Sequence, residues 1–178
     1  MAKKDYALGS YEAAALMGVH FTRPGRMFDA GVLTGRLLDP VAATKSDRSF
    51  AIFSSLSCQE NFAGYEIAQA GKAGRTYRPR AWLDDRPAML KRLAAMTPKI
   101  DYDDAIGTAE AAKLLGVHIS LVPRLVTQGK ICGRVPWNPR HSGGSRGLII
   151  SRRSCEANRR EVAAAEKAGK KRGKARYA

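Results

Sequence analysis

The feature that most constrains the fold is an internal repeat, in which residues 5–36 align without gaps to residues 103–134. Fourteen of the 32 aligned positions are identical, whereas usage of about 7% per residue type would give roughly two or three by chance. The match continues, because residues 50–61 align with residues 147–158 at an offset one residue shorter. Each unit therefore spans about 55–65 residues, the size of a small domain rather than of a solenoid turn.

Each repeat is expected to begin with a short helix. Ser10 and Thr108 stand where a helix N-cap belongs, and a glutamate follows in the first turn of each copy, where its charge favours the helix dipole. We expect the helices over residues 11–17 and 109–115, with an alanine-rich face suited to close packing by a second helix. Gly18 and its counterpart then stand where a capping glycine would end the helix.

A second short helix is expected after a tight turn in each copy. Thr22 and Ser120 are its expected N-caps, and a proline follows at the second or third helical position, where the missing N–H costs little. Gly31 and Gly129 would end these helices. Two short helices joined by a tight glycine turn form a helix-turn-helix.

The residues after each helix pair are typical of β structure. Apolar runs predict a first strand over residues 32–38 and 131–135, and a partner strand over residues 50–53 and 148–150. The loops between them carry basic side chains, namely Lys45 and Arg48 in the first copy and Arg140, His141 and Arg146 in the second. A hairpin with a basic loop beside a helix-turn-helix is a wing.

The remaining segments are expected to close and connect the two units. Residues 57–72 and 154–170 are typical of helices that would close each domain. A linking helix is expected between Asp84-Asp85 and Pro98, because acidic residues and a proline begin an apolar stripe that Pro98 ends. The fold class is therefore mainly α with small β-hairpins. The expected parts are a first domain over 1–75, a helical linker over 76–101, a second domain over 102–166 and a flexible basic tail over 167–178.

This order of elements resembles the excisionase and MerR-type winged helix-turn-helix superfamily. In the second copy the resemblance is carried by Glu110 to Val117, by Arg124-Leu125-Val126, by Gly129-Lys130 and by Gly133-Arg134. Their counterparts in the first copy are Glu12 to Val19, Arg26, Gly31 and Gly35-Arg36. The resemblance covers both repeat cores and implies a recognition helix that enters DNA. Where the family has serine or threonine directly after Gly-Val, this chain has His20 and His118, so the family's base-reading pattern is not carried over unchanged.

The charge of the chain favours a polyanionic partner. Lys and Arg number 31 against 16 Asp and Glu, which gives a net charge of +15, and nucleic acid is the commonest partner of such a chain. The second copy is the more basic, because no Asp or Glu occurs from Ala111 to Cys155. We therefore expect the second copy to attract a polyanion more strongly than the first.

Several classes of function are disfavoured by the sequence. No apolar run is long enough to span a bilayer, and the N-terminus lacks the apolar stretch of a signal peptide. The three cysteines show no CxxC spacing, which argues for a reducing compartment, and no His or Cys pair has the spacing of metal ligands. We therefore expect a cytoplasmic, nucleoid-associated protein that is not an enzyme, with no metal, no cofactor and no membrane partner.

These features together predict a protein that binds double-stranded DNA with sequence specificity. We expect a mobile-element regulator, either a recombination directionality factor or a transcriptional repressor, that reads direct-repeat half-sites. Self-association along DNA and a recombinase or polymerase partner are compatible with that role. The alternatives are a plasmid-partition or DNA-organising protein and, in a different class, an RNA-binding or ribosome-associated protein. The expected DNA-binding residues are His20, Thr22, Arg23, Arg26, Arg36, Lys45, Arg48, His118, Ser120, Arg124, Arg134, Arg140, His141, Arg146, Lys170, Lys171, Arg172 and Lys174.

Two interpretations stay open for the residues that recur in both copies. His20 and His118 stand just before the second helix, where each either caps the turn or contacts a phosphate or a base edge. Arg36 and Arg134 stand at the start of the hairpins, where each either contacts phosphate or braces the wing.

Overall fold

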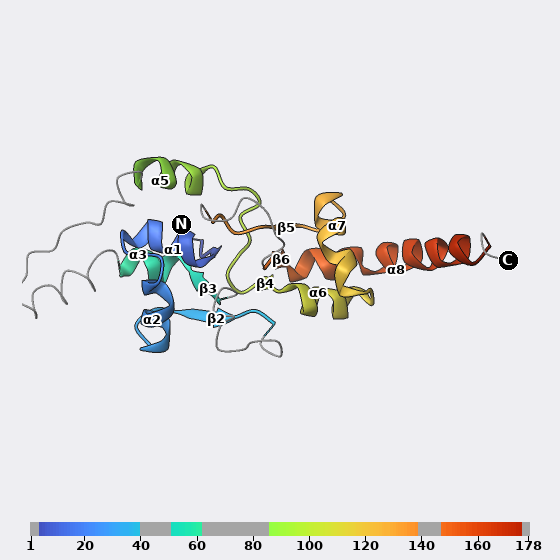
Figure 1. Ribbon diagram of the computed structural model, residues 1–178, viewed down its shortest axis with the longest axis horizontal. Helices are drawn as coiled ribbons and strands as arrows, with labels where there is room; N and C mark the ends of the chain where they lie inside the picture. The colour runs from blue at the N-terminus through green and yellow to red at the C-terminus, as the bar shows by residue number, and fades with distance from the viewer. Residues whose placement is uncertain (1–3, 40–50, 62–85, 139–146, 176–178) are drawn as a thin grey trace, which may run out of the picture.

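The two repeats have the same order of helices and strands in the computed structural model, which describes residues 4–39, 51–61, 86–138 and 147–175 (Figure 1). The first repeat consists of β1 (Ala7–Leu8), α1 (Ser10–Met17), α2 (Arg23–Asp29), β2 (Gly35–Leu37), β3 (Ala51–Ser54) and α3 (Ser55–Glu60). The second consists of β4 (Ala105–Ile106), α6 (Thr108–Leu115), the 3₁₀-helix η4 (Ile119–Leu121), α7 (Val122–Thr127), β5 (Gly133–Arg134), β6 (Ile149–Ser151) and α8 (Arg152–Ala175). The fold is therefore mixed, with helices around two small antiparallel sheets.

Each sheet has three strands, in the order β1-β3-β2 and β4-β6-β5. The central strand of each is the predicted partner strand, and it is buried along its length. The predicted first strands are shorter than expected, because only residues 35–37 and 133–134 pair with the central strand. The outer strands β1 and β4 escaped the sequence analysis, since two residues are too few to show an alternating pattern.

The first helix of each repeat ends as the sequence predicts. Gly18 and Gly116 adopt left-handed conformations with φ of 73° and 67°, which glycine adopts without strain. The start differs by one residue, because Gly9 and Gly107 occupy the N-cap positions and Ser10 and Thr108 are the first helical residues. The Gly9 backbone N–H donates to the Glu12 carboxylate at 2.8 Å.

The described residues form three apolar clusters. The first lies within the first repeat, around Met17, Met27 and Phe53, and the second lies within the second repeat, around Leu115 and Ile150. The third cluster joins the two repeats, and its buried members are Ala7, Leu38, Ile52, Ile100, Ala105 and Ile149. The two repeats therefore share a core in addition to their own.

The connecting and terminal helices differ in part from the expectation. The linking helix is present as α5 (Arg86–Ala94) and packs against α1, with Leu93 and Met96 on the first core. A flexible tail is expected from residue 167, but α8 continues as one helix from Arg152 to Ala175. Only α3 represents the first closing helix within the described residues; the rest of the predicted segment 57–72 lies outside them beyond Asn61. Among the described helices, none is both long and apolar enough to cross a membrane.

Candidate nucleic-acid interface

The turn between the paired helices is built in the same way in both repeats. The His118 Nδ1 atom accepts the Ser120 backbone N–H at 3.3 Å and lies 2.8 Å from the Ser120 hydroxyl. The His20 Nδ1 atom lies 3.4 Å from the Thr22 nitrogen and 2.9 Å from its hydroxyl. Each histidine thus satisfies a backbone N–H in the turn that leads into the second helix, at the N-cap of α2 in the first repeat and within η4 in the second. The capping interpretation is confirmed for His118, the N-cap of η4, and His20 accepts the equivalent N–H. Thr22 occupies the N-cap position of α2 as predicted, although its side chain makes no capping bond, whereas the prediction of Ser120 is corrected because Ser120 lies within η4.

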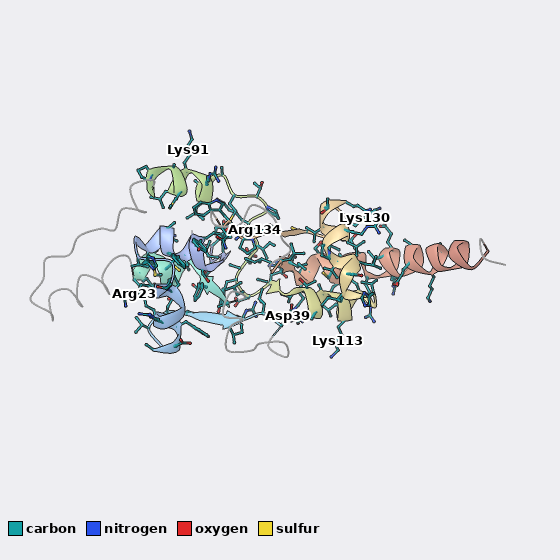
Figure 2. All side chains as sticks on the ribbon, in the orientation of Figure 1. Arg23, Asp39, Lys91, Lys113, Lys130 and Arg134 are labelled. Atoms are coloured by element: carbon teal, nitrogen blue, oxygen red, sulfur yellow. The ribbon has the colours of Figure 1, made fainter. Side chains whose placement is uncertain are left out.

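The second helix of each pair presents an arginine on its outer side. Arg26 on α2 and Arg124 on α7 occupy equivalent positions and are both exposed, whereas Met27 and Val122 face the core. Thr22, His118 and Ser120 are exposed beside them, and His20 and Arg23 are partly exposed. Arg23 lies on the outer side of α2 (Figure 2). The two turns and second helices therefore bring these predicted residues together in two separate groups, one in each repeat.

Two exposed side chains of the second repeat escaped the sequence analysis. Gln128 directly follows α7, and Ile119 is 46% exposed between His118 and Ser120. Neither has an identical counterpart in the first repeat, so comparison of the two copies did not select them. Only their position, in the turn and at the end of the helix, could have indicated them as candidate DNA-binding residues.

Arg134 does not lie on the surface, which corrects its prediction as a DNA-contacting residue. Its side chain is 6% exposed and forms an ion pair with Glu12 of the other repeat, with Nη1–Oε1 and Nη2–Oε2 distances of 2.6 and 2.9 Å. Nη2 also donates to the Ala7 carbonyl at 2.8 Å. A guanidinium held by a buried carboxylate is not available to a phosphate. Arg134 therefore braces the contact between the repeats (Figure 2).

Arg36 has the matching role in the opposite direction. It donates from Nη2 to the carbonyls of Tyr102 and Ala105 in the second repeat, at 2.7 Å for Tyr102. Its guanidinium carbon lies 5.2 Å from the centre of the Tyr102 ring, within the range of a cation–π contact. The prediction of a DNA contact is corrected for Arg36 as well, because these carbonyls engage the outer end of its side chain.

Further contacts between the repeats involve residues that the sequence analysis did not select. The Asp39 carboxylate accepts the backbone N–H groups of Ala109 and Glu110 at 3.0 and 3.2 Å, at the N-terminus of α6. The Trp137 backbone N–H donates to the Glu12 carboxylate at 2.9 Å. An acid at a helix N-terminus satisfies free N–H groups and complements the helix dipole. These contacts join residues far apart in the sequence, so no local pattern indicated them.

The other predicted residues are placed only in part. Lys45, Arg48, Arg140, His141 and Arg146 lie outside the described residues. Lys170, Lys171, Arg172 and Lys174 belong to α8, whose backbone is helical there, and their side chains lie outside the described part of the structure.

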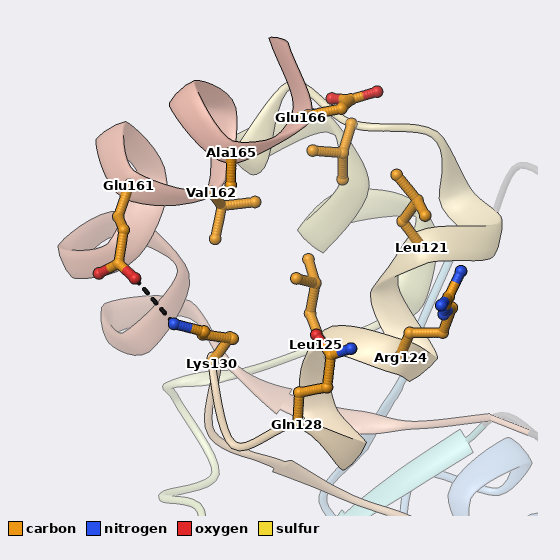
Figure 3. Close-up of a pocket in the computed structure, with 10 residues that line it drawn as sticks. Leu121, Arg124, Leu125, Gln128, Lys130, Glu161, Val162, Ala165 and Glu166 are labelled. Atoms are coloured by element: carbon orange, nitrogen blue, oxygen red, sulfur yellow. Dashed lines mark hydrogen bonds and ion pairs between the residues drawn. The ribbon is translucent and has the colours of Figure 1, made fainter. Parts of the chain in front are cut away.

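A cavity of about 460 Å³ lies between the second helix pair and α8, beside Arg124. Leu121, Leu125 and Val162 point into it, and Arg124 stands at its edge (Figure 3). Lys130 and Glu161 form an ion pair of 2.9 Å on the opposite side of the cavity from Arg124 (Figure 3). The cavity walls are therefore apolar, with charged groups at the rim, and α8 packs against α6 rather than filling the space beside α7.

Cys58 and Cys155 are buried free thiols and Cys132 is half-buried, and the described residues hold no cluster of side chains that could bind a metal. Burial raises the pKa of Cys58 to about 12 and that of Cys155 to about 11. Since only the thiolate is nucleophilic, we expect neither thiol to react with a disulfide reagent at pH 8 while the protein is folded. Ellman titration of native and denatured protein measures this: fast modification of Cys58 in the native state would contradict it, and the half-buried Cys132 is the internal comparison.

Comparison of this chain with protein-family models, with curated proteins and with solved structures gives no match.

Proposed function

We propose that this protein binds double-stranded DNA with sequence specificity through two winged helix-turn-helix units. The observation that carries the proposal is the pair of exposed arginines at equivalent positions of the two repeats, each on a short helix that follows a turn in which a histidine accepts a backbone N–H. An exposed arginine on a helix of a helix-turn-helix can make a bidentate contact with guanine in the major groove. The net charge of +15 supports a polyanionic partner.

The proposed contacts divide into base reading and backbone binding. Arg26 and Arg124 are the proposed guanine readers, and Ile119 can contact a thymine methyl group. The phosphate contacts come from the basic residues of the wing loops and of the end of α8, namely Lys45, Arg48, Arg140, His141, Arg146, Lys170, Lys171, Arg172 and Lys174. Phosphate contacts fix the position on DNA without reading its sequence.

The narrower role that we propose is regulation of a mobile element, as a recombination directionality factor or a transcriptional repressor. The support for this role is the resemblance of both repeat cores to the excisionase and MerR-type superfamily, on the residues given above.

A comparison of nucleic acids tests the proposed function. We expect the full chain to bind random-sequence DNA duplexes more tightly than RNA duplexes of the same length, because the deep and narrow major groove of A-form RNA does not admit a helix. Fluorescence anisotropy with labelled DNA and RNA duplexes measures both affinities. Equal or tighter binding to RNA would contradict the proposal and favour the RNA-binding alternative.

The basic end of α8 gives a separate prediction. Each phosphate contact lowers the slope of log affinity against log salt by about 0.9. Replacing Lys170, Lys171, Arg172 and Lys174 by glutamine should weaken binding to all duplexes alike and make that slope shallower. Anisotropy titrations at several salt concentrations measure the change. A loss of sequence preference with an unchanged salt slope would show that this segment reads bases instead.

A further inference from the structure

Some of the contacts between the two repeats are reciprocal. Arg134 of the second repeat donates to the Ala7 carbonyl of the first, and Arg36 of the first donates to the Ala105 carbonyl of the second. Arg36 and Arg134 are equivalent positions, and so are Ala7 and Ala105. Each repeat therefore uses the same residue to contact the same site on the other.

The residues that follow these arginines repeat the pattern. In the first repeat Asp39 reaches the N-terminus of α6, so that a Cβ atom on Gly107 would lie 2.4 Å from its carboxylate. In the second repeat Pro136 reaches the N-terminus of α1, and a Cβ atom on Gly9 would lie 2.6 Å from its ring. The shared core also contains matched pairs, Ala7 with Ala105 and Ile52 with Ile149.

Reciprocal contacts of this kind are those of an isologous interface, in which two units are related by a two-fold axis. The arrangement in Figure 1 agrees: α2 lies to the lower left and α7 to the upper right of the contact between the repeats, and α1 and α6 also lie on opposite sides of it. A head-to-tail arrangement would instead use different surfaces on the two units. The prediction of direct-repeat half-sites assumed such an arrangement.

We propose that the DNA target is an inverted repeat bound by one chain, with one half-site for each helix pair. This inference rests on the proposed function and names the symmetry of its target. Two units related by a two-fold axis present their second helices in opposite directions, and DNA half-sites follow the symmetry of the protein. The proposal replaces direct repeats with inverted ones.

The two half-sites share one base and differ at another. Arg26 and Arg124 are equivalent, so each half-site has a guanine at the same place. Gln128 is equivalent to Ala30, and glutamine pairs with adenine whereas alanine forms no hydrogen bond to a base. The target is therefore an imperfect inverted repeat, with an adenine preference in the half-site of the second repeat.

Selection from a pool of randomised DNA duplexes by the full chain tests the symmetry. We expect enriched duplexes to contain two related motifs in inverted orientation, with centres roughly 10 bp or a multiple of that distance apart. Direct orientation, or a single half-site, would overturn the inference and leave DNA binding intact. Failure to enrich any motif would overturn the proposed sequence-specific function, and the inference with it.

Stoichiometry and spacing distinguish one chain from two. Native mass spectrometry of the selected duplex should give one chain per inverted repeat; two chains per repeat would overturn the inference.

Inserting about 5 bp between the motifs turns one half-site to the opposite face of the duplex. Binding should then weaken about 100-fold, toward that of a single half-site, because the second contact is lost. An insertion of about 10 bp, which restores the face, is the matched control for rotation against length. Unchanged affinity on the 5 bp insertion would overturn the fixed two-fold arrangement.

Discussion

The Arg134→Ala variant is expected to have a free energy of unfolding about 3–5 kcal/mol below that of the wild type. Arg134 is the partner of Glu12, whose side chain is 1% exposed. Among the described residues, removing the guanidinium leaves the buried carboxylate with the backbone N–H groups of Gly9 and Trp137 as its donors. A buried charge that loses its counter-charge is strongly destabilising, far more than the loss of a surface pair. Urea denaturation followed by circular dichroism measures the change.

The second repeat offers a matched control. Glu110 occupies the position equivalent to Glu12, but it pairs with Arg152 where both side chains are about 40% exposed, at 42% and 41%. Arg152→Ala should therefore cost less than about 1 kcal/mol, because solvent screens an exposed pair. Equal losses in the two variants would contradict a buried ion pair between the repeats.

The double variant Arg26→Ala/Arg124→Ala should lose about 2–6 kcal/mol of binding free energy on the selected duplex, since each bidentate arginine–guanine pair contributes about 1–3 kcal/mol of discrimination. Its affinity for random duplexes should change little, because other basic residues supply the phosphate contacts. Both side chains are exposed, so the variant should remain as stable as the wild type. Anisotropy titrations on the selected and random duplexes, with a denaturation curve for each protein, measure these effects.

Two controls separate base reading from charge. Lys91→Ala/Lys113→Ala removes the same charge from exposed positions on α5 and α6, and it should leave the preference for the selected duplex intact. Arg26→Lys/Arg124→Lys keeps the charge but loses the bidentate geometry of the guanidinium, and it should lose that preference. Equal losses on selected and random duplexes in the alanine variant would show that the arginines bind only the backbone.

The sequence predicts the local elements of this fold well, for physical reasons. Glycines that must adopt positive φ mark the ends of the first helices, and Gly18 and Gly116 do so. The buried central strands follow from their apolar runs. Alignment of the two repeats identifies the matched arginines on the second helices, and both side chains are exposed.

The contact between the repeats could not be predicted from the same patterns. Arg134 and Glu12 are 122 residues apart, and a hairpin arginine has the same local signature whether it binds phosphate or a buried carboxylate. Neither arginine alone indicates the contact between the repeats, because a reciprocal contact needs both arginines and both opposing sites. Extension of α8 was missed for another reason: its end has no apolar period, and helix propensity alone is a weak guide.

Methylation interference on the selected duplex tests the central claim most directly, because it reports whether guanine is contacted in the major groove. Arg26 and Arg124 are proposed to donate to guanine N7 and O6. Methylation of one guanine N7 in each half-site should therefore block binding of the wild-type chain. In Arg26→Ala the block should vanish from one half-site, and in Arg124→Ala from the other. Interference at neither guanine, or an unchanged pattern in both variants, would contradict DNA reading by these two helices.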